Sequence, residues 1–393
     1  MALVVTIVVL LILAGISIRL VLDNNGIISR AGDAKDKHEQ GRVNDQTDLN
    51  SAVDYINQMT GENGGGSEGG SLPTGTGTTP YYPGSNFTQV TGTNLSTGLV
   101  IQDGSGNQYV WIEVPKTEAI YGEDNLNITE FSNTELNTIK GKLIAYTSDY
   151  RKSGYSDKWY NGCGVSQANY PIMYNKMLKS VYQNGGFWIG RYEAGIGTNR
   201  TSHSTIAADL VPTSKANQNP LTYITCREAQ TLASRVLPSG GTYTSSLMFG
   251  VQWDLVLKYL ETKGTSQADL KTDSTNWGNY SNATGFTITN TNAQYSTNDG
   301  ASWARVTTAG YQKPSSAVLL TTGADARNSK MNIYDLAGNV WEWTLEYTSR
   351  SSLPCTRRGG NYLGDGSLCP ASNRNVYFTT TSDNYHGARV SLY

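Results

Sequence analysis

The residues best able to do covalent or acid–base chemistry are few in this chain of 393 residues. The four cysteines are Cys163, Cys226, Cys355 and Cys369, and the three histidines are His38, His203 and His386. No two cysteines form a C-x-x-C pair, so a zinc knuckle is not indicated, and no histidine lies in a recognisable nucleophile or metal motif. In an oxidising compartment four cysteines allow three disulfide pairings, among which the sequence does not choose. General-base catalysis therefore has few candidates.

Six blocks contain the elements that would have to position any site. In chain order they are "GGFWIGRYEAG" (185–195), "NPLTYITCREAQTLASRV" (219–236), "SLMFGVQWDLVLKYL" (246–260), "NIYDLAGNVWEWT" (332–344), "RRGGNY" (357–362) and "GARVSL" (387–392). Apolar residues at spacings of three and four predict helices over 225–236 and 249–262. The polar stretch 269–302 is expected to be a long surface excursion.

These blocks occur in the same order in the formylglycine-generating enzyme family, which the chain resembles over most of residues 87–393. The best single marker is "DLAGNVWEW" (335–343). The resemblance implies an α+β, C-type-lectin-like fold of the formylglycine-generating-enzyme type, a compact domain dominated by irregular loops.

The same resemblance implies a metal site in the "DLAGNVWEW" turn. In the resembling enzymes this turn holds calcium through side-chain and backbone oxygens, and the matching positions here are Asp335, Gly338, Val340 and Glu342. Carboxylate and carbonyl oxygens suit a hard cation. One structural calcium is therefore expected, and no organic cofactor. At least one of Trp341 and Trp343 is expected to fill the core.

Catalysis of the family's kind needs two cysteines five residues apart, shortly after the "RGG" turn, because one thiolate holds copper or pairs while the other exchanges. Counting from Arg358 places these roles at Gly364 and Cys369. Gly364 has no side chain, so the thiol pair is absent, and Cys355 precedes the turn. The expectation is that the protein is not an enzyme; an exported oxidase of the formylglycine-generating type is the alternative.

The C-terminal segment resembles a second group of proteins with this fold, the variable proteins of diversity-generating retroelements. These end in an "RGG…ASNR…GxRV" frame, in which adenines are replaced at random. At an AAC or AAT codon such replacement cannot produce Lys, Gln, Glu, Met or Trp, and none of these five occurs from Arg357 to Tyr393. The resemblance implies a ligand-binding, adhesin- or receptor-like protein whose C-terminal face is diversified by a retroelement.

Twelve residues of this frame follow no helical or strand period and are the expected ligand contacts: Tyr362, Leu363, Asp365, Leu368, Cys369, Val376, Tyr377, Phe378, Asp383, Asn384, Tyr385 and His386. Their mixture of aromatic and short polar side chains resembles that of an antibody paratope. The residues expected to be constant are Arg358, Gly359, Gly360, Pro370, Ala371, Ser372, Arg374, Gly387 and Arg389. Their types suit tight turns and loops tied by several hydrogen bonds. The plainer interpretation is an ordinary C-terminus with buried aromatic residues.

Overall composition narrows the class of partner. The net charge is −2, so nucleic acid is not indicated as a partner. Only 16% of residues are charged, while Gly, Asn, Ser, Thr and Tyr are abundant, which is typical of an exported protein. The expected ligand is a protein or glycan on the surface of a cell, a host or a phage.

The chain begins with an apolar segment. Residues 2–18, "ALVVTIVVLLILAGISI", carry no charge and would span about 26 Å as a helix, close to the roughly 30 Å of a bilayer core. A membrane helix is therefore expected over 1–22, and a cleaved signal peptide is the alternative. The first sixty or so residues resemble type IV pilins and pseudopilins, which implies pilin-like assembly and, as a further alternative, a filament subunit.

The other boundaries follow from composition and periodicity. A helical stalk is expected over 23–60, a Gly/Ser/Thr-rich flexible linker over 61–86, and the lectin-like domain over 87–393 with a variable region at about 357–393. Together these features predict a protein displayed at the cell surface, anchored by a single N-terminal membrane helix with its C-terminal head outside.

Overall fold

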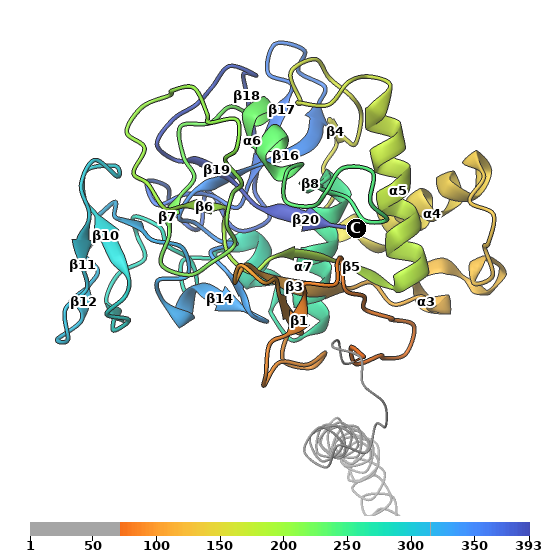
Figure 1. Ribbon diagram of the computed structural model, residues 1–393, viewed down its shortest axis with the longest axis horizontal. Coiled ribbons are helices and arrows are strands. Elements are labelled where there is room, and N and C mark those ends of the chain that lie inside the picture. The colour runs from red at the N-terminus through yellow and green to blue at the C-terminus, as the bar shows by residue number, and fades with distance from the viewer. Residues whose placement is uncertain (1–70, 315) are drawn as a thin grey trace, which may run out of the picture. The chain divides into compact units, whose positions relative to one another are not determined.

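Two β-sheets organise residues 71–314 and 316–393, the part of the chain that the computed structural model describes. The first has six strands in the order β1-β2-β3-β5-β20-β8, and each neighbouring pair is antiparallel (Figure 1). Its strands are β1 (Thr88–Gln89), β2 (Val100–Gln102), β3 (Gln108–Glu113), β5 (Gly186–Gly190), β8 (Ser245–Leu247) and β20 (Val390–Leu392). The C-terminal strand thus lies inside the sheet, which locks the end of the chain into the fold.

The second sheet carries most of the C-terminal frame. Strand β16 (Trp341–Thr348) pairs antiparallel with β17 (Cys355–Arg358) and parallel with β19 (His386–Ala388). Strand β17 in turn pairs antiparallel with β18 (Arg374–Tyr377), and β4 (Tyr155–Ser156) pairs with the far end of β16. Residues that are distant in the sequence therefore share one sheet surface.

Five helices pack around the sheets within the described residues: α3 (Glu118–Tyr121), α4 (Asn133–Tyr146), α5 (Asn169–Asn184), α6 (Cys226–Ala233) and α7 (Gly250–Thr262). Helix α5 packs on β5 and α7 packs on β3. The predicted helices over 225–236 and 249–262 are present as α6 and α7. Helix α6 begins with a capping box in which Thr225 and Glu228 satisfy each other's backbone N–H groups.

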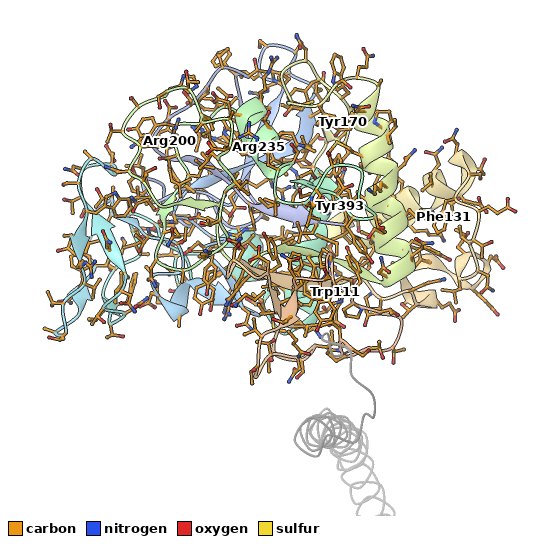
Figure 2. All side chains as sticks on the ribbon, in the orientation of Figure 1. Trp111, Phe131, Tyr170, Arg200, Arg235 and Tyr393 are labelled. Carbon is orange, nitrogen blue, oxygen red and sulfur yellow. The ribbon has the colours of Figure 1, made fainter. Side chains whose placement is uncertain are left out.

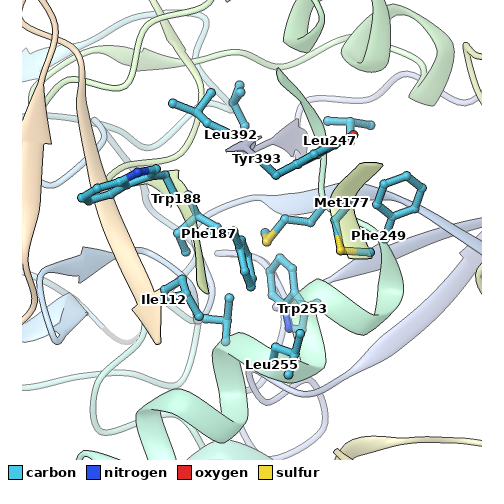
Figure 3. Packing of buried hydrophobic residues seen from close by; sticks show 14 of the residues in the cluster. Ile112, Met177, Phe187, Trp188, Leu247, Phe249, Trp253, Leu255, Leu392 and Tyr393 are labelled. Atoms are coloured by element: carbon cyan, nitrogen blue, oxygen red, sulfur yellow. The ribbon is translucent and has the colours of Figure 1, made fainter. Parts of the chain in front are cut away.

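The hydrophobic core lies between these helices and the six-stranded sheet. Trp111 and Trp188, on neighbouring strands, meet edge to face with ring centroids 5.0 Å apart. Figure 3 shows Trp188, Phe187 and Trp253 in the same buried cluster. The buried C-terminal Tyr393, labelled in Figure 2, donates or accepts a hydrogen bond at Ser246. The indole of Trp253 donates to the Ala371 carbonyl (3.0 Å), which ties the C-terminal frame to the core.

Small two- and three-stranded sheets occupy the loops. They are β6 (Gly195–Ile196) with β7 (Asn219–Pro220), β9 (Thr287–Ile288) with β12 (Tyr311–Gln312), β10 (Gln294–Ser296) with β11 (Ala304–Arg305) and β13 (Leu319–Leu320), and β14 (Ser329–Lys330) with β15 (Ile333–Tyr334). Strands β10, β11 and β12 lie together at one side of the domain (Figure 1). The stretch 269–302 is only partly the surface excursion that was expected, because Trp277, Asn279 and Tyr280 are buried.

The domain begins earlier than the predicted boundary at residue 87. Leu72 and Tyr81 are buried, and the Tyr81 ring stacks on Tyr243 with centroids 4.2 Å apart. The Tyr81 hydroxyl donates to the Leu392 carbonyl (3.2 Å). Residues 71–86, expected to belong to a flexible linker, therefore pack on the domain. Backbone hydrogen bonds add to these side-chain contacts, among them one from the Trp188 indole to the Tyr81 carbonyl (2.9 Å).

The prediction of a cell-surface location is corrected. Across residues 71–314 and 316–393, no helix combines the length and the apolar character needed to cross a bilayer. The longest described helix, α5, has 16 residues, whereas a span needs about 20. The predicted membrane helix (1–22), the pilin-like resemblance and the stalk (23–60) fall on residues outside the described part of the chain.

Candidate functional site

The second sheet has two chemically different faces, because neighbouring residues of a strand point to opposite sides. Register places Arg358 of β17 on one face with Arg374 of β18 and Glu342 of β16. We call this the arginine–carboxylate face. The same strand register places Arg357 on the opposite face of the sheet. We call this the aromatic face, and its residues are Arg357, Trp341, Trp343, Tyr377 and His386.

The arginine–carboxylate face is held by a buried charge network. Arg358 pairs with Asp254 of α7 (3.0 Å) and Glu346 of β16 (3.4 Å), and Arg374 pairs with the same two carboxylates. Arg151 adds a third guanidinium on Asp254 (3.0 Å). Burial would raise the pKa of Glu346, but the charges of Arg374 and Arg358 outweigh burial and hold this pKa below its ordinary value. The network joins α7, β16, β17 and β18 into one unit.

A second anchor fixes the turn before the last strand. Arg389 donates to both oxygens of Glu342 (2.6 to 3.1 Å) and to the carbonyls of Gly190 (3.0 Å) and Tyr334 (2.8 Å). The planar Arg389 guanidinium thus donates hydrogen bonds to one carboxylate and two carbonyl groups at once, which a lysine could not do.

Two of the four predicted calcium ligands, Asp335 and Glu342, lie beside this anchor. Asp335 accepts a hydrogen bond from the Gly323 N–H at Oδ2 (2.6 Å), while its buried Oδ1 has no partner within the described residues. Burial raises the pKa of Asp335 to about 7. Glu342 is already engaged by Arg389, and no group of three or more Asp, Glu, His or Cys side chains among the described residues is arranged to hold a metal. Asp335 therefore fits a cation and Glu342 does not, and the calcium stays a prediction.

Sequence reasoning missed Glu193, the buried carboxylate that shapes this turn. It accepts hydrogen bonds from the Asn339 amide (2.6 Å) and the Val340 N–H (3.0 Å). Burial, and then Asp335, raise its pKa well above the ordinary value. Gly338, with φ of 78°, packs so closely on Asn279 that an added Cβ would lie 2.2 Å from its carbonyl oxygen. Glu193 lies within the quoted block "GGFWIGRYEAG", but nothing local in that block indicates a contact almost 150 residues away.

The backbone at Gly364 and Cys369 keeps the geometry that a thiol pair would need. A Cβ built on Gly364 would lie 3.8 Å from the Cys369 Cβ, the separation usual in disulfides. Burial raises the pKa of the Cys369 thiol, which opposes thiolate chemistry. Cys355 lies elsewhere, in a buried cluster with Cys226 and Tyr160. All four cysteines are free.

The twelve expected ligand contacts divide by exposure. Leu363, Leu368 and Phe378 are exposed. Part-buried positions are Asp365, Cys369, Val376, Tyr377, Asp383, Asn384 and Tyr385. Tyr362 and His386 are buried. Among the described residues only five large hydrophobic side chains are exposed, and three of them belong to this set. Val376 points to the opposite face of β18 from Tyr377.

The two buried members support the face from below. The Tyr362 hydroxyl donates to Asp299 (2.6 Å) and accepts from the Asn384 amide (2.7 Å). The His386 ring stacks on Trp343, with centroids 4.7 Å apart. Burial, followed by the charge of Arg357, lowers the pKa of His386 to about 2, so the ring is neutral at ordinary pH.

Arg357 was not among the predicted site residues, yet it is the centre of the aromatic face. Its guanidinium lies 4.2 Å from the Tyr377 ring centroid, 4.6 Å from Trp341 and 5.6 Å from Tyr385, and it contacts His386 Nε2. The sequence signal that could have indicated a separate role for Arg357 was the double arginine of "RRGG". In a strand, neighbouring residues point to opposite faces, so Arg357 and Arg358 have different surroundings.

A polar cleft of about 310 Å³ borders the exposed Leu368. Its basic lining residues are Arg151, Lys152, Lys271 and Arg374. Arg151 and Arg374 are paired with Asp254, so the two lysines supply the unpaired charge of this rim within the described residues.

Comparison with known proteins agrees with this architecture. The family described as sulfatase-modifying factor enzyme 1-like domain (FGE-sulfatase) matches residues 176–392, more than half of the chain. The protein belongs to this family, and its domain has the α+β, C-type-lectin-like fold of the formylglycine-generating-enzyme type that the sequence blocks predicted.

Two solved structures are similar at low identity. CarF is 15% identical, with 52% of this chain and 85% of that chain covered and a TM-score of 0.30. Treponema denticola variable protein 1 is 14% identical, with 72% and 84% covered and a TM-score of 0.22. No match was found among curated proteins.

Proposed function

We propose that this protein is a non-catalytic ligand-binding protein, and that a retroelement diversifies its C-terminal recognition face. The observation that carries the proposal is the division of the frame by burial. Eight of the nine residues expected to be constant are buried, and the ninth, Ser372, is part-buried. Ten of the twelve expected contacts are exposed or part-buried. Substitution at most contact positions would thus leave the scaffold intact.

The constant residues make the bonds on which the fold depends. Arg358, Arg374 and Arg389 hold the buried carboxylates. Gly359 and Gly360 have φ of 88° and 83°, and a Cβ on Gly360 would lie 2.4 Å from the Cys369 carbonyl oxygen. Such positions resist other side chains. Random replacement there would unfold the domain, whereas replacement at Leu363 or Phe378 removes only surface contacts.

The exposed set has the chemistry of a recognition surface. Leu363, Leu368 and Phe378 are large apolar groups held in water by a rigid frame, and burying them against a partner would contribute about 25 cal/mol per Å². Asp365, Asp383 and Asn384 add short polar groups that adapt to different partners. A protein or glycan surface is the ligand class that this mixture fits.

Two displayed libraries of equal size test the scaffold argument. One randomises Leu363, Asp365, Leu368, Phe378 and Asn384; the control randomises Pro370, Ala371, Arg374, Gly387 and Arg389. We expect most members of the first library to resist protease and most of the control to be cleaved. Selection of the first library on purified proteins and glycans should then yield binders. Equal loss of folding, or no binder from any target, would contradict the proposal.

The DNA beside the gene tests diversification separately. We expect a near-copy of the segment encoding residues 357–393 that differs mainly at adenines, next to a gene for a reverse transcriptase. If both are missing, diversification fails as an explanation, while the binding role still depends on the libraries.

The alternative is an oxidase, favoured by family membership and by the retained spacing between Gly364 and Cys369. The test is turnover of a cysteine-containing peptide with copper. We expect none from the natural chain. Gly364→Cys should bring a second thiol within bonding distance of Cys369, measured as the loss of two titratable thiols on oxidation. Turnover by the natural chain would overturn the non-catalytic assignment.

A further inference from the structure

Arg357 differs from the other arginines of the C-terminal frame in its partners. Arg358, Arg374 and Arg389 each pair with at least one carboxylate. Arg357 is only 6% exposed, yet it makes no ion pair with any carboxylate among the described residues. A buried charge without a counter-ion costs several kcal/mol. A functional role of the Arg357 guanidinium would explain why its charge is buried without a counter-ion in the described part of the chain.

The surroundings of Arg357 offset this cost only in part. Ring faces of Trp341, Tyr377 and Tyr385 lie within 6 Å of the guanidinium, and each such contact contributes about 0.5–2 kcal/mol. His386 accepts one hydrogen bond from Nη1. The buried Nε has no partner within the described residues. Donor capacity and positive charge both remain unused.

The acid beside His386 belongs to the rim and forms no ion pair with Arg357. Asp383 lies 3.5 Å from His386 Nδ1, on the far side of that ring from Arg357, with 41% of its side chain exposed. Burial, then Arg357, lowers the pKa of His386, which keeps a second positive charge out of the cluster. The cluster therefore presents a single uncompensated charge.

The rings around Arg357 reach the surface at the expected contact positions. Trp341 is buried, but Tyr377 and Tyr385 are part-buried. A ligand that contacts these two rings lies close to the guanidinium, whose centre is 4.2 Å from the Tyr377 centroid and 5.6 Å from the Tyr385 centroid.

We infer that Arg357, with Trp341, Tyr377 and Tyr385, forms a subsite for one carboxylate of the ligand, flanked by an aromatic or aliphatic group. This inference rests on the proposed binding function and names the ligand chemistry of the same face. One guanidinium balances one negative charge, so a carboxylate fits better than a phosphate dianion, whose second charge would lie unpaired near Asp383. The rings favour an apolar group next to the carboxylate.

A matched pair of probes tests the subsite on the whole 393-residue chain. Phenylacetate and phenylacetamide share a ring and differ in charge. Binding of each is measured by saturation-transfer difference NMR, with the natural chain, Arg357→Gln and the control Arg350→Gln, whose side chain is exposed. Thermal unfolding verifies that each variant is folded.

We expect the natural chain and Arg350→Gln to bind phenylacetate at least about tenfold more tightly than phenylacetamide, the ratio for one lost charged hydrogen bond. Arg357→Gln should bind the two probes alike. Equal binding of acid and amide by the natural chain overturns the inference, whether or not Arg357→Gln folds. So does full acid preference in Arg357→Gln. Library binders whose targets carry no carboxylate would defeat the subsite but leave the binding function standing, whereas a lack of binders defeats the function.

Discussion

The two faces of the second sheet use the same residue type for opposite purposes. Arg358 on the arginine–carboxylate face lies between Asp254 and Glu346, and its charge links β17 to α7 and β16. Arg357, its neighbour in sequence, lies among aromatic rings and forms no ion pair with a carboxylate of the described residues. The first arrangement is a scaffold that tolerates no change. The second leaves charge and donors available to a partner, which is what separates a binding position from a structural one.

Removing each arginine in turn should give the largest difference. Arg358→Met leaves Glu346 and Asp254 short of a counter-charge and orphans the carbonyl of Asn373, to which Arg358 donates (3.1 Å). We expect a loss of about 3–5 kcal/mol in the free energy of unfolding. Arg357→Met removes a buried charge whose cost its surroundings offset only in part, so the free energy of unfolding should rise, or fall by less than about 1 kcal/mol. Urea unfolding curves compare the two. Equal losses would mean that both arginines are structural.

Lowering the pH should reduce the free energy of unfolding because His386 of the aromatic face is neutral in the folded chain. The pKa of His386 is about 2 in the folded chain and about 6.5 when unfolded. Above about pH 6.5 the His386 ring is neutral in both the folded and the unfolded chain. Below that pH only the unfolded chain takes up the proton, so the free energy of unfolding falls as pH falls. The loss is about 1.4 kcal/mol per pH unit.

His386→Gln keeps an acceptor for Arg357 and does not titrate. Relative to the natural chain, its stability should rise steadily from pH 6.5 to 4.5. The exposed His203, which contacts Glu228, supplies the control His203→Gln, which should show no comparable trend. Urea unfolding at each pH measures the difference, and parallel curves for His386→Gln and the natural chain would refute the assignment.

Local signals predicted the elements better than they predicted the faces. Helices α6 and α7 follow from apolar spacing. At least one tryptophan of "DLAGNVWEW" was expected in the core, and Trp341 and Trp343 are both buried. Helix α5 was not predicted; its buried face mixes tyrosines, such as Tyr170 and Tyr174, with aliphatic residues.

The site was harder because its contacts span the chain. The expected contact set included Tyr362 and His386, which are buried. Tyr362 is hydrogen bonded to Asp299, and His386 is stacked on Trp343. It missed Arg357, whose role depends on which face of β17 it occupies. That face is decided by pairing with β16 and β18, and no residue near Arg357 in the sequence carries this information.

Calcium provides a smaller test, on the carboxylates beside Arg389. Asp335 has a free buried oxygen, so a bound cation would relieve the penalty that burial places on its charge. At ten times its Kd, calcium should raise the free energy of unfolding by about 1.4 kcal/mol, and Asp335→Asn should remove that rise while keeping an acceptor for the Gly323 N–H. Thermal unfolding of chelator-treated protein, with and without calcium, measures it. An unchanged melting temperature of the natural chain would remove calcium from the site.

The smallest effects on stability should come from the exposed apolar residues. Leu368 is 74% exposed and Phe378 is 54% exposed, so Leu368→Ser and Phe378→Ser should each change the free energy of unfolding by less than about 0.5 kcal/mol. Leu345→Ser, at a fully buried position of β16, is the control and should cost several kcal/mol. The two surface variants should weaken binding to a partner selected on the natural face. A large loss of stability would instead mean that Leu368 and Phe378 are packed by other residues of the chain. The distinction between buried scaffold positions and exposed contact positions would then fail.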